Sequence, residues 1–197
     1  MSAAIPGIVL AAGASTRMGR PKAFLPMTPG GTMLGRVVGT LADAGIAPLV
    51  VVARDPFAIQ DAWSDPRAVD VRLVVNPQPD RGQLSSLVCG IEAIDPSVPA
   101  VMMTLVDVPL VRLTTVAALL RAWERDRAVL VRPLYDGRHG HPVIFGRRLL
   151  GALAQGDLVH GAKPIVRSFS RDAVNVPVGD PGVLIDLDTP EEYARHT

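Results

Sequence analysis

The sequence has a single cysteine, Cys89, no long apolar run and almost no net charge. One cysteine argues against a disulfide framework or a cysteine-rich zinc site within the chain. No window approaches the roughly 20 apolar residues of a membrane span, and no basic N-terminal region precedes an apolar stretch, so we expect a soluble, cytoplasmic protein without a membrane partner. A formal net charge of +1 lacks the positive field that holds nucleic acid, so we expect no nucleic-acid partner.

Hydrophobic residues make up 48% of the chain, which is enough for the core of one large domain spanning residues 1–197. Apolar runs typical of buried strands alternate with segments of helical periodicity. This alternation predicts an α/β fold with a three-layer, doubly wound, mostly parallel sheet of the Rossmann-like kind. The predicted strands are residues 5–10, 48–53, 71–75, 100–106, 128–131, 142–145, 173–178 and 183–185. The predicted helices are residues 32–44, 55–63, 84–94, 114–125, 147–154, 162–169 and 190–196, and residues 132–141 are predicted as a loop with a turn at Asp136-Gly137.

Ligands of such a sheet bind beyond the carboxyl ends of the strands. The loops expected there carry most of the residues with binding chemistry. They are Arg17, Lys22, Gln83, Ser85, Ser86, Asp107, Arg138, His139 and His141.

The loop after the first strand, residues 10–22, combines two glycines with Arg17, Arg20 and Lys22. Flexible backbone, free N–H donors and positive charges are the components of a phosphate site. The loop is neither a Walker A sequence nor the Gly-x-Gly-x-x-Gly fingerprint. The alternative is an ordinary connection with exposed basic residues. Because connections much longer than about six residues more often serve a ligand, we favour an anion site.

Asp107 ends a wholly apolar strand, where a carboxylate is difficult to explain as core filling. Mg²⁺ takes oxygen ligands and is often bound by one or two carboxylates plus substrate phosphates. A turn or cap before Pro109 is the alternative, but beside a phosphate loop we favour a metal ligand. Asp186 is a candidate second metal contact. Asp188 immediately precedes a capping-box pattern, so capping is the simplest role for it.

Arg138, His139 and His141 lie in a glycine-containing loop. With no further histidine or cysteine nearby, the two imidazoles are a weak zinc signal, and contact with an anionic substrate is the better interpretation. Ser85 and Ser86 open a predicted helix, where they either cap it or help its N-terminus hold an anion or a base edge. No nucleophile elbow or Cys/His pair is present, which argues against a covalent acyl-enzyme.

Five stretches together resemble the MobA-like nucleotidyltransferases, and within that group the molybdenum-cofactor cytidylyltransferases (MocA type). They extend over almost the whole chain: residues 10–22 (LAAGASTRMGRPK), 82–87 (GQLSSL), 106–109 (VDVP), 140–143 (GHPV) and 186–193 (DLDTPEEY). The sequence departs from the family's pattern at Pro79-Asp80, where an aromatic residue is expected, and at Lys163, where an arginine is common.

The resemblance implies transfer of a nucleoside monophosphate from a nucleoside triphosphate to the terminal phosphate of molybdopterin or the molybdenum cofactor, with Mg²⁺ as cofactor and pyrophosphate as product. The Ala11-Ala12-Gly13 sequence, where guanylyltransferases of the group tend to have a Gly-Gly pair, favours CTP over GTP. A molybdoenzyme or its chaperone is the implied partner protein. By the same resemblance the nucleotide contacts are Leu10, Ala11, Ala12, Gly13, Gln83, Ser85 and Ser86, the catalytic residues are Arg17, Lys22 and Asp107, and the acceptor contacts are Arg138, His139 and His141.

Two other functions are compatible with these residues. A sugar-1-phosphate or another small phosphate is an alternative acceptor, because the same nucleotide half serves such reactions. A non-catalytic carrier of a nucleotide or of molybdopterin is the alternative outside enzymes.

Overall fold

The computed structural model describes residues 4–15, 18–28, 31–55 and 70–196. In this part of the chain, eight strands form one sheet in the order β3-β2-β1-β4-β7-β5-β6, and β8 pairs with β5. The pairs β1–β2, β2–β3, β1–β4 and β5–β8 are parallel, whereas β7 and β6 pair antiparallel with their neighbours. The strands are β1 Gly7–Ala11, β2 Leu49–Ala53, β3 Val71–Val75, β4 Ala100–Leu105, β5 Leu130–Tyr135, β6 Arg138–His139, β7 Val143–Gly146 and β8 Ala173–Pro177.

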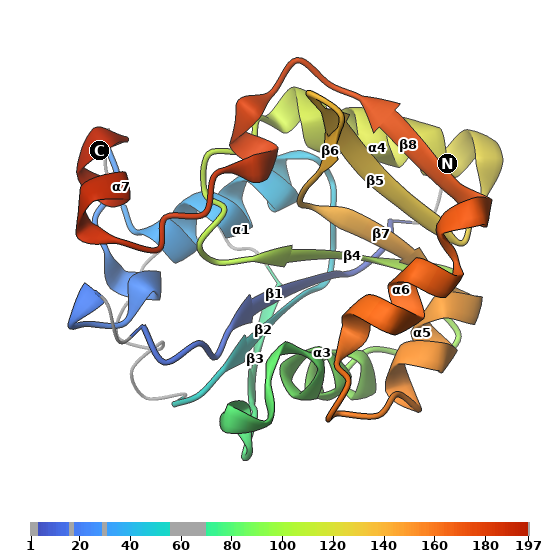
Figure 1. Cartoon of the computed structure of the whole chain (residues 1–197), viewed down its shortest axis with the longest axis horizontal. Helices are drawn as coiled ribbons and strands as arrows, with labels where there is room; N and C mark the ends of the chain where they lie inside the picture. Colours follow the sequence, from blue (N-terminus) through green and yellow to red (C-terminus); the bar gives the residue numbers. More distant parts are fainter. Residues whose placement is uncertain (1–3, 16–17, 29–30, 56–69, 197) are drawn as a thin grey trace.

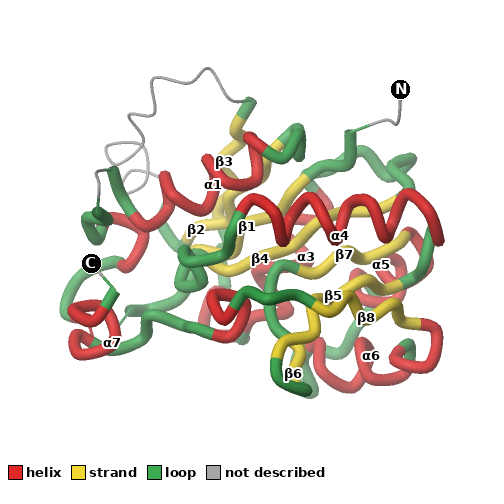
Figure 2. The backbone as a smooth tube through the Cα atoms, turned by 90° about the horizontal axis from the view of Figure 1, so that it is seen from above, coloured by secondary structure: helices red, strands yellow, loops and turns green. Residues whose placement is uncertain are grey.

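Helices cover both faces of this sheet (Figures 1 and 2). The α-helices are α1 Met33–Asp43, α3 Gln83–Glu92, α4 Leu113–Asp126, α5 Arg147–Ala154, α6 Ala162–Ser168 and α7 Pro190–Arg195. Short 3-10 helices are η2 Lys22–Phe24, η3 Pro79–Arg81, η4 Ser170–Asp172 and η5 Pro181–Leu184. Helices α1 and α4 pack on one face, and α3, α5 and α6 pack on the other. The expected three-layer, mostly parallel α/β fold is confirmed.

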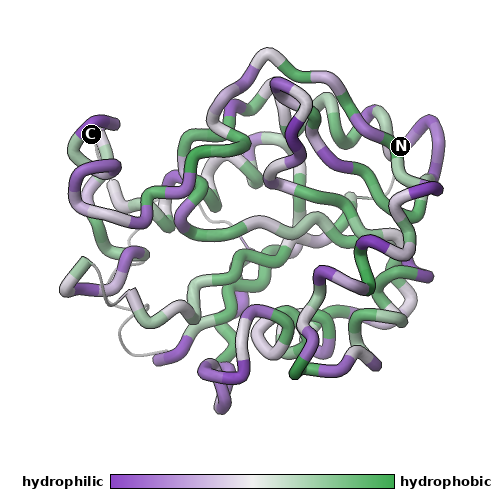
Figure 3. The backbone as a smooth tube through the Cα atoms, viewed as in Figure 1, coloured by the Kyte–Doolittle hydropathy of each residue, from purple (hydrophilic) through white to green (hydrophobic). Residues whose placement is uncertain are grey.

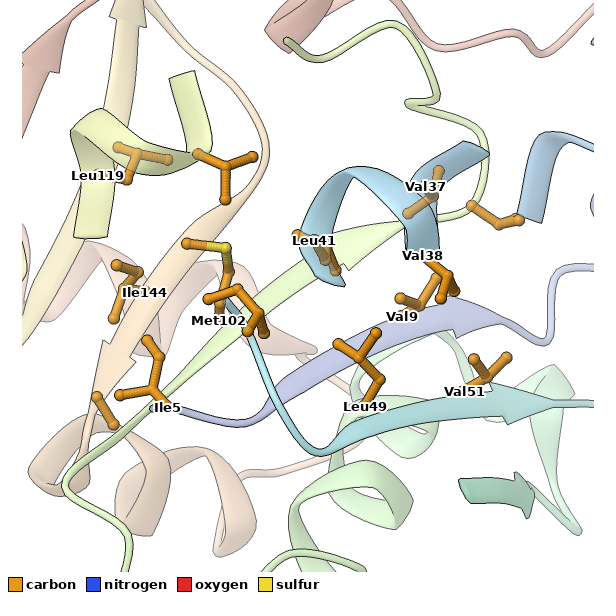
Figure 4. Close-up of a cluster of buried hydrophobic side chains, with 14 of the residues drawn as sticks. Ile5, Val9, Val37, Val38, Leu41, Leu49, Val51, Met102, Leu119 and Ile144 are labelled. Carbon is orange, nitrogen blue, oxygen red and sulfur yellow. The ribbon is translucent and has the colours of Figure 1, made fainter. Parts of the chain in front are cut away.

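The central strands are buried on both faces because both of their side-chain rows are apolar, as in parallel sheets covered by helices. Val9 and Met102 point into the core on the α1 side together with Leu41 (Figure 4). Ile8 and Leu10 enter the core on the α3 side. Figure 3 shows the hydrophobic colour following these strands, with hydrophilic residues gathered toward the outside.

The C-terminal segment returns to the loop that follows β1. Leu187 is fully buried in a small apolar cluster with Leu25, Met27 and Met33, and the Tyr193 hydroxyl donates a hydrogen bond to the Pro26 carbonyl. Figure 1 shows α7 beside the segment that contains η2. Residues near both ends of the sequence therefore meet at the carboxyl edge of β1.

The strand predicted at residues 183–185 is wrong, because the Asp180 side chain organises this segment as the 3-10 helix η5. Its carboxylate accepts hydrogen bonds from the Gly182 amide at 3.0 Å, the Thr115 hydroxyl at 2.7 Å and the Arg112 amide at 2.9 Å. These bonds attach η5 to the start of α4. A side chain that satisfies nearby backbone donors stabilises a turn in competition with a strand ladder.

The loop predicted at residues 132–141 is partly a strand. Strand β5 extends to Tyr135, and the predicted turn at Asp136-Gly137 is confirmed, with φ values of 47° and 71°, before β6. Such positive φ values are typical of the tight turn of a hairpin. The helix predicted at residues 55–63 lies outside the described residues apart from its first position. No α-helix in the described residues is long and apolar enough to cross a membrane.

Candidate functional site: a cleft at the carboxyl edge of the sheet

A cleft of about 470 Å³ opens where β1, β2 and β4 end. These strands are parallel, so their carboxyl ends meet at one edge, and the segments that follow them surround a shared space. The cleft is lined by Leu10, Ala11, Ala12, Gly13, Ala14, Ser15, Lys22, Ala23, Arg54, Pro79, Asp80, Gly82, Gln83, Ser86, Leu105, Val106, Asp107 and Asp188.

Lys22 occupies one end of the cleft. Its ammonium group donates to Asp107 Oδ2 at 3.0 Å and to Asp188 Oδ1, and its amide donates to the Ser15 hydroxyl at 3.1 Å. Burial disfavours the charged form of Lys22, but the hydrogen bonds and charges of Asp188 and Asp107 outweigh it and raise the lysine pKa. The ammonium therefore stays protonated at a fixed position, although its two partners lie 85 and 166 residues away in sequence.

Asp107 lies two residues after the end of β4, with a side chain 22% exposed. Its Oδ1 atom is buried and has no hydrogen-bond partner among the described residues. Burial raises the pKa of this carboxyl, Lys22 opposes the shift, and the nearby carboxylate of Asp188 adds to it. The Asp107 carbonyl accepts a hydrogen bond from the Leu187 amide at 2.8 Å, which brings the C-terminal carboxylates to the cleft.

The two C-terminal carboxylates differ in their contacts. Asp188 contacts Lys22, and the cap of α7 is Thr189, whose hydroxyl accepts from the Glu192 amide at 3.2 Å. Asp186 is more exposed than Asp188 and does not line the cleft. Partial burial and the negative charges of Asp107 and Asp188 raise the pKa of Asp186.

This end of the cleft has the chemistry that a hard divalent cation requires. Asp107 and Asp188 present carboxylate oxygens, and one of these oxygens is buried without a partner in the described chain. The described residues contain no group of three or more His, Cys, Asp or Glu side chains arranged for a metal. Mg²⁺ usually keeps several water or phosphate ligands and needs only one or two protein carboxylates. The pair of Asp107 and Asp188 therefore fits Mg²⁺ better than it fits a metal whose ligands all come from the protein.

The wall on the α3 side is held by a buried asparagine that the sequence patterns did not single out. Asn76 Nδ2 donates to the Ser85 and Ser86 hydroxyls at 2.8 and 2.9 Å, and its Oδ1 accepts from the Gln78 amide at 2.8 Å. Ser86 lines the cleft, and so does Gln83, whereas Ser85 lies behind them and donates to the Gly82 carbonyl at 2.7 Å. Asn76 directly follows β3, and this position at a strand end was the available signal.

The residues expected at an acceptor do not line this cleft. Arg138 and His139 are exposed on β6. The His141 amide donates to the Val183 carbonyl at 3.0 Å, and its Nδ1 is buried without a partner in the described chain. Burial lowers the pKa of His141 to about 4, so the ring is neutral at physiological pH.

Arg132, which the sequence patterns also did not single out, lies beside these residues on β5. Its Nε donates to Asn175 Oδ1 at 2.8 Å. Partial burial and the Arg132 charge lower the pKa of His139. Arg17, expected at the triphosphate, lies outside the described residues.

A cleft at the carboxyl edge of an α/β sheet, with an ammonium and two carboxylates at one end, defines a phosphate- and nucleotide-binding class of protein. Residues 7–174 match the family model of the MobA-like NTP transferase domain. The chain therefore belongs to this family and is a nucleotidyltransferase of the MobA-like type, as its sequence resemblance implies.

Two curated relatives and one solved structure match nearly the full chain. The molybdenum cofactor cytidylyltransferase of Escherichia coli (strain K12) is 22% identical over 191 residues, which cover 96% of this chain and 94% of that protein. Nicotine blue oxidoreductase of Paenarthrobacter nicotinovorans is 30% identical over 204 residues, which cover 97% of this chain and 95% of that protein. The crystal structure of Rv0371c from Mycobacterium tuberculosis H37Rv superposes with a TM-score of 0.81 at 27% identity, covering 98% of this chain and 97% of that one.

Proposed function

We propose that this protein transfers CMP from CTP to the terminal phosphate of a molybdopterin-type acceptor, with release of pyrophosphate. The observation that carries the proposal is the end of the cleft where Lys22 is held between Asp107 and Asp188. The similarity to the E. coli cytidylyltransferase over 96% of this chain supports the choice of nucleotide and acceptor.

The residues of the cleft suit a reaction that depends on positioning and charge. A phosphate oxygen of the acceptor is already ionised at neutral pH, so its attack on the α-phosphorus needs no strong base. Lys22 would contact the triphosphate, while Ala11, Ala12 and Gly13 would lie along the nucleoside. Asp107 and Asp188 would hold Mg²⁺, which supplies positive charge to phosphate oxygens when bound.

The test is pyrophosphate release from CTP, GTP or ATP, measured with and without a molybdopterin-type acceptor. We expect release that requires the acceptor and is fastest with CTP. Asp107→Ala should abolish it, and Lys22→Ala should raise the KM for the triphosphate. The control is Lys163→Ala, because Lys163 is the only other lysine and is exposed on α6.

The alternatives give different results in the same assay. Release with a sugar-1-phosphate, and none with molybdopterin, would favour the other acceptor class. Binding of nucleotide or molybdopterin without release would favour a carrier. Near-normal turnover of Asp107→Ala would refute the metal assignment.

The 30% identity to nicotine blue oxidoreductase supports a second candidate, an oxidoreductase. Reduction of nicotine blue on adding an electron donor, without pyrophosphate release from a nucleoside triphosphate, would favour it. We prefer the transferase because the cleft holds an ammonium and carboxylates suited to phosphate and a cation.

A further inference from the structure

The cleft has a second charged end, opposite to Lys22. Arg54 follows the last residue of β2, and Asp80 lies in η3, the 3-10 helix that precedes α3; both line the cleft. Two Arg54 nitrogens reach the Asp80 carboxylate, at 2.7 Å from Nη2 to Oδ1 and 3.4 Å from Nη1 to Oδ2. Lys22, Asp107 and Asp188 together form the Lys22 cluster. Because β1 lies between β2, which precedes Arg54, and β4, which precedes Asp107, the Arg54–Asp80 pair and the Lys22 cluster lie toward opposite sides of β1.

This arrangement determines how a nucleotide would lie. Neighbouring strands are about 4.8 Å apart, so the ends of β2 and β4 are separated by roughly 10 Å across β1. A triphosphate held at Lys22 would place its nucleoside along residues 10–13 and direct its base toward Arg54 and Asp80. The inference therefore rests on the proposed function, because it takes the triphosphate to bind at Lys22.

The Arg54–Asp80 pair contributes little to folding. The Asp80 side chain is 84% exposed and that of Arg54 is 39% exposed, and ion pairs between exposed side chains are screened by water and salt. The hydrogen bond from Arg54 and its positive charge lower the pKa of Asp80, so the carboxylate is ionised at neutral pH. The consequence of the pair is therefore local: it connects the turn formed by η3 to the end of β2.

The same turn is fixed on its inner side. Asn76 accepts from the Gln78 amide and donates to Ser85 and Ser86, so the chain before and after η3 is attached to the buried wall. Gly82, with φ at +90°, then turns the chain into α3. With Asn76 on the inside and Arg54 on the outside, Pro79–Arg81 is held across the end of the cleft.

We propose that the Arg54–Asp80 ion pair sets the base preference of the cleft by holding the Pro79–Arg81 turn across its end, so that a pyrimidine fits and a purine is excluded. A purine extends further from the ribose than a pyrimidine and would overlap the turn. Exclusion by overlap is a common way to discriminate between ligands that otherwise make the same contacts. Releasing the turn from Arg54 would lower that barrier without removing a contact to the phosphates, while Asn76 would still hold the turn on its inner side.

The experiment measures equilibrium binding of CTP and GTP to the full chain by calorimetry without acceptor, so that no turnover is required. The variants are Arg54→Ala, Asp80→Ala, both together, and the charge exchange Arg54→Asp with Asp80→Arg. The matched control is Arg125→Ala, which removes another exposed ion pair, Arg125–Asp126, at the end of α4.

We expect the wild-type protein and the control to bind CTP about tenfold or more tightly than GTP. Each single variant should reduce this ratio by binding GTP more tightly while keeping its affinity for CTP. The double variant should match the single ones, because the two residues act as a pair. The charge exchange should restore the preference for CTP.

Three results would overturn the inference: a CTP/GTP ratio that is unchanged in both single variants, a wild-type preference for GTP, or variants that lose affinity for both nucleotides equally. A wild-type protein that binds neither nucleotide would refute the proposed function and the inference with it. Binding that discriminates as expected, without pyrophosphate release on adding an acceptor, would support the inference and contradict only the transferase reaction.

Discussion

Replacing Lys22 with methionine tests whether its ammonium neutralises the carboxylates of the cleft. Methionine keeps the apolar stem of the side chain and removes the charge. Asp107 and Asp188 would then face each other without their shared cation, because Lys22 contacts both of them. We expect a folded protein of lower stability.

The size of the loss follows from the exposure of the three side chains. Removing one partner of a buried pair costs about 3–5 kcal/mol, whereas exposed pairs contribute roughly 0–1 kcal/mol. The side chains of Lys22, Asp107 and Asp188 are 12%, 22% and 41% exposed, so solvent screens the group partly. We therefore expect a loss of about 2–3 kcal/mol, which lowers the Tm by roughly 4–12 °C in a chain of this length.

The assay is thermal unfolding of the wild-type protein, Lys22→Met and Lys163→Met, in EDTA and then with MgCl₂. A ligand that binds only the folded state raises the Tm by mass action. Mg²⁺ should raise the Tm of Lys22→Met more than that of the wild-type protein, because the cation replaces the missing charge. The reasoning is refuted if Lys22→Met unfolds like Lys163→Met, or if Mg²⁺ shifts the Tm of all three proteins equally.

Three further substitutions test residues outside the Lys22 cluster. The folded-state pKa of His141 is about 4 against an ordinary 6.5, so the unfolded chain takes up the proton first and stability should fall by about 3 kcal/mol as the pH drops from 6.5 to 4. Urea unfolding should show this fall in His160→Gln but not in His141→Gln, and equal profiles would contradict it. Asn76→Ala should cost about 1–3 kcal/mol and weaken CTP binding, since it leaves buried groups unpaired, and unchanged CTP affinity would show that the wall does not depend on it. Asp180→Ala should cost about 3 kcal/mol in urea, because it leaves two amides and the Thr115 hydroxyl without their acceptor; a loss within the error of the measurement would show that η5 does not need this cap.

The sheet could be predicted from the sequence because its central strands are apolar on both faces. The runs at residues 48–53 and 100–106 have no polar alternation that would place one face in water, and the structure buries nearly every residue of β2 and β4. The rule that ligands bind at carboxyl ends then placed Lys22 and Asp107 at one edge, although 85 residues separate them. The hydrophobic pattern and the sheet topology were therefore sufficient to predict that Lys22 and Asp107 lie at the same edge.

The choice between Asp186 and Asp188 depends on a tertiary contact that the sequence pattern does not contain. The Leu187 amide donates to the Asp107 carbonyl, and the Leu187 side chain is fully buried. These two contacts fix the direction of each neighbouring side chain, and Asp188 is the one that reaches Lys22. A rule based on residue type and spacing cannot distinguish Asp186 from Asp188, because the two carboxylates stand on either side of the same leucine.

The burial of His141 also depends on a tertiary contact that the sequence pattern does not contain. Glycine on one side and proline on the other suggest an accessible segment, and a histidine there suggests contact with a ligand. A Cβ at Gly140 would overlap the Val183 carbonyl, so the chain passes too close to η5 for any larger residue, and the imidazole is enclosed with it. The close approach depends on η5, the segment whose secondary structure was itself predicted wrongly.

The charges of the cleft support the proposal that a divalent cation takes part in the reaction. Asp107 and Asp188 bring two negative charges to the place where a triphosphate would bring several more, and Lys22 supplies one positive charge. Lys22 cannot neutralise the carboxylates and the phosphates together, and repulsion between like charges at this distance is strong where burial limits screening. Without a divalent cation, the carboxylates that hold Lys22 in position would oppose the binding of the nucleotide. A Mg²⁺ ion held by Asp107 and Asp188 would offset this repulsion by supplying positive charge to the phosphates.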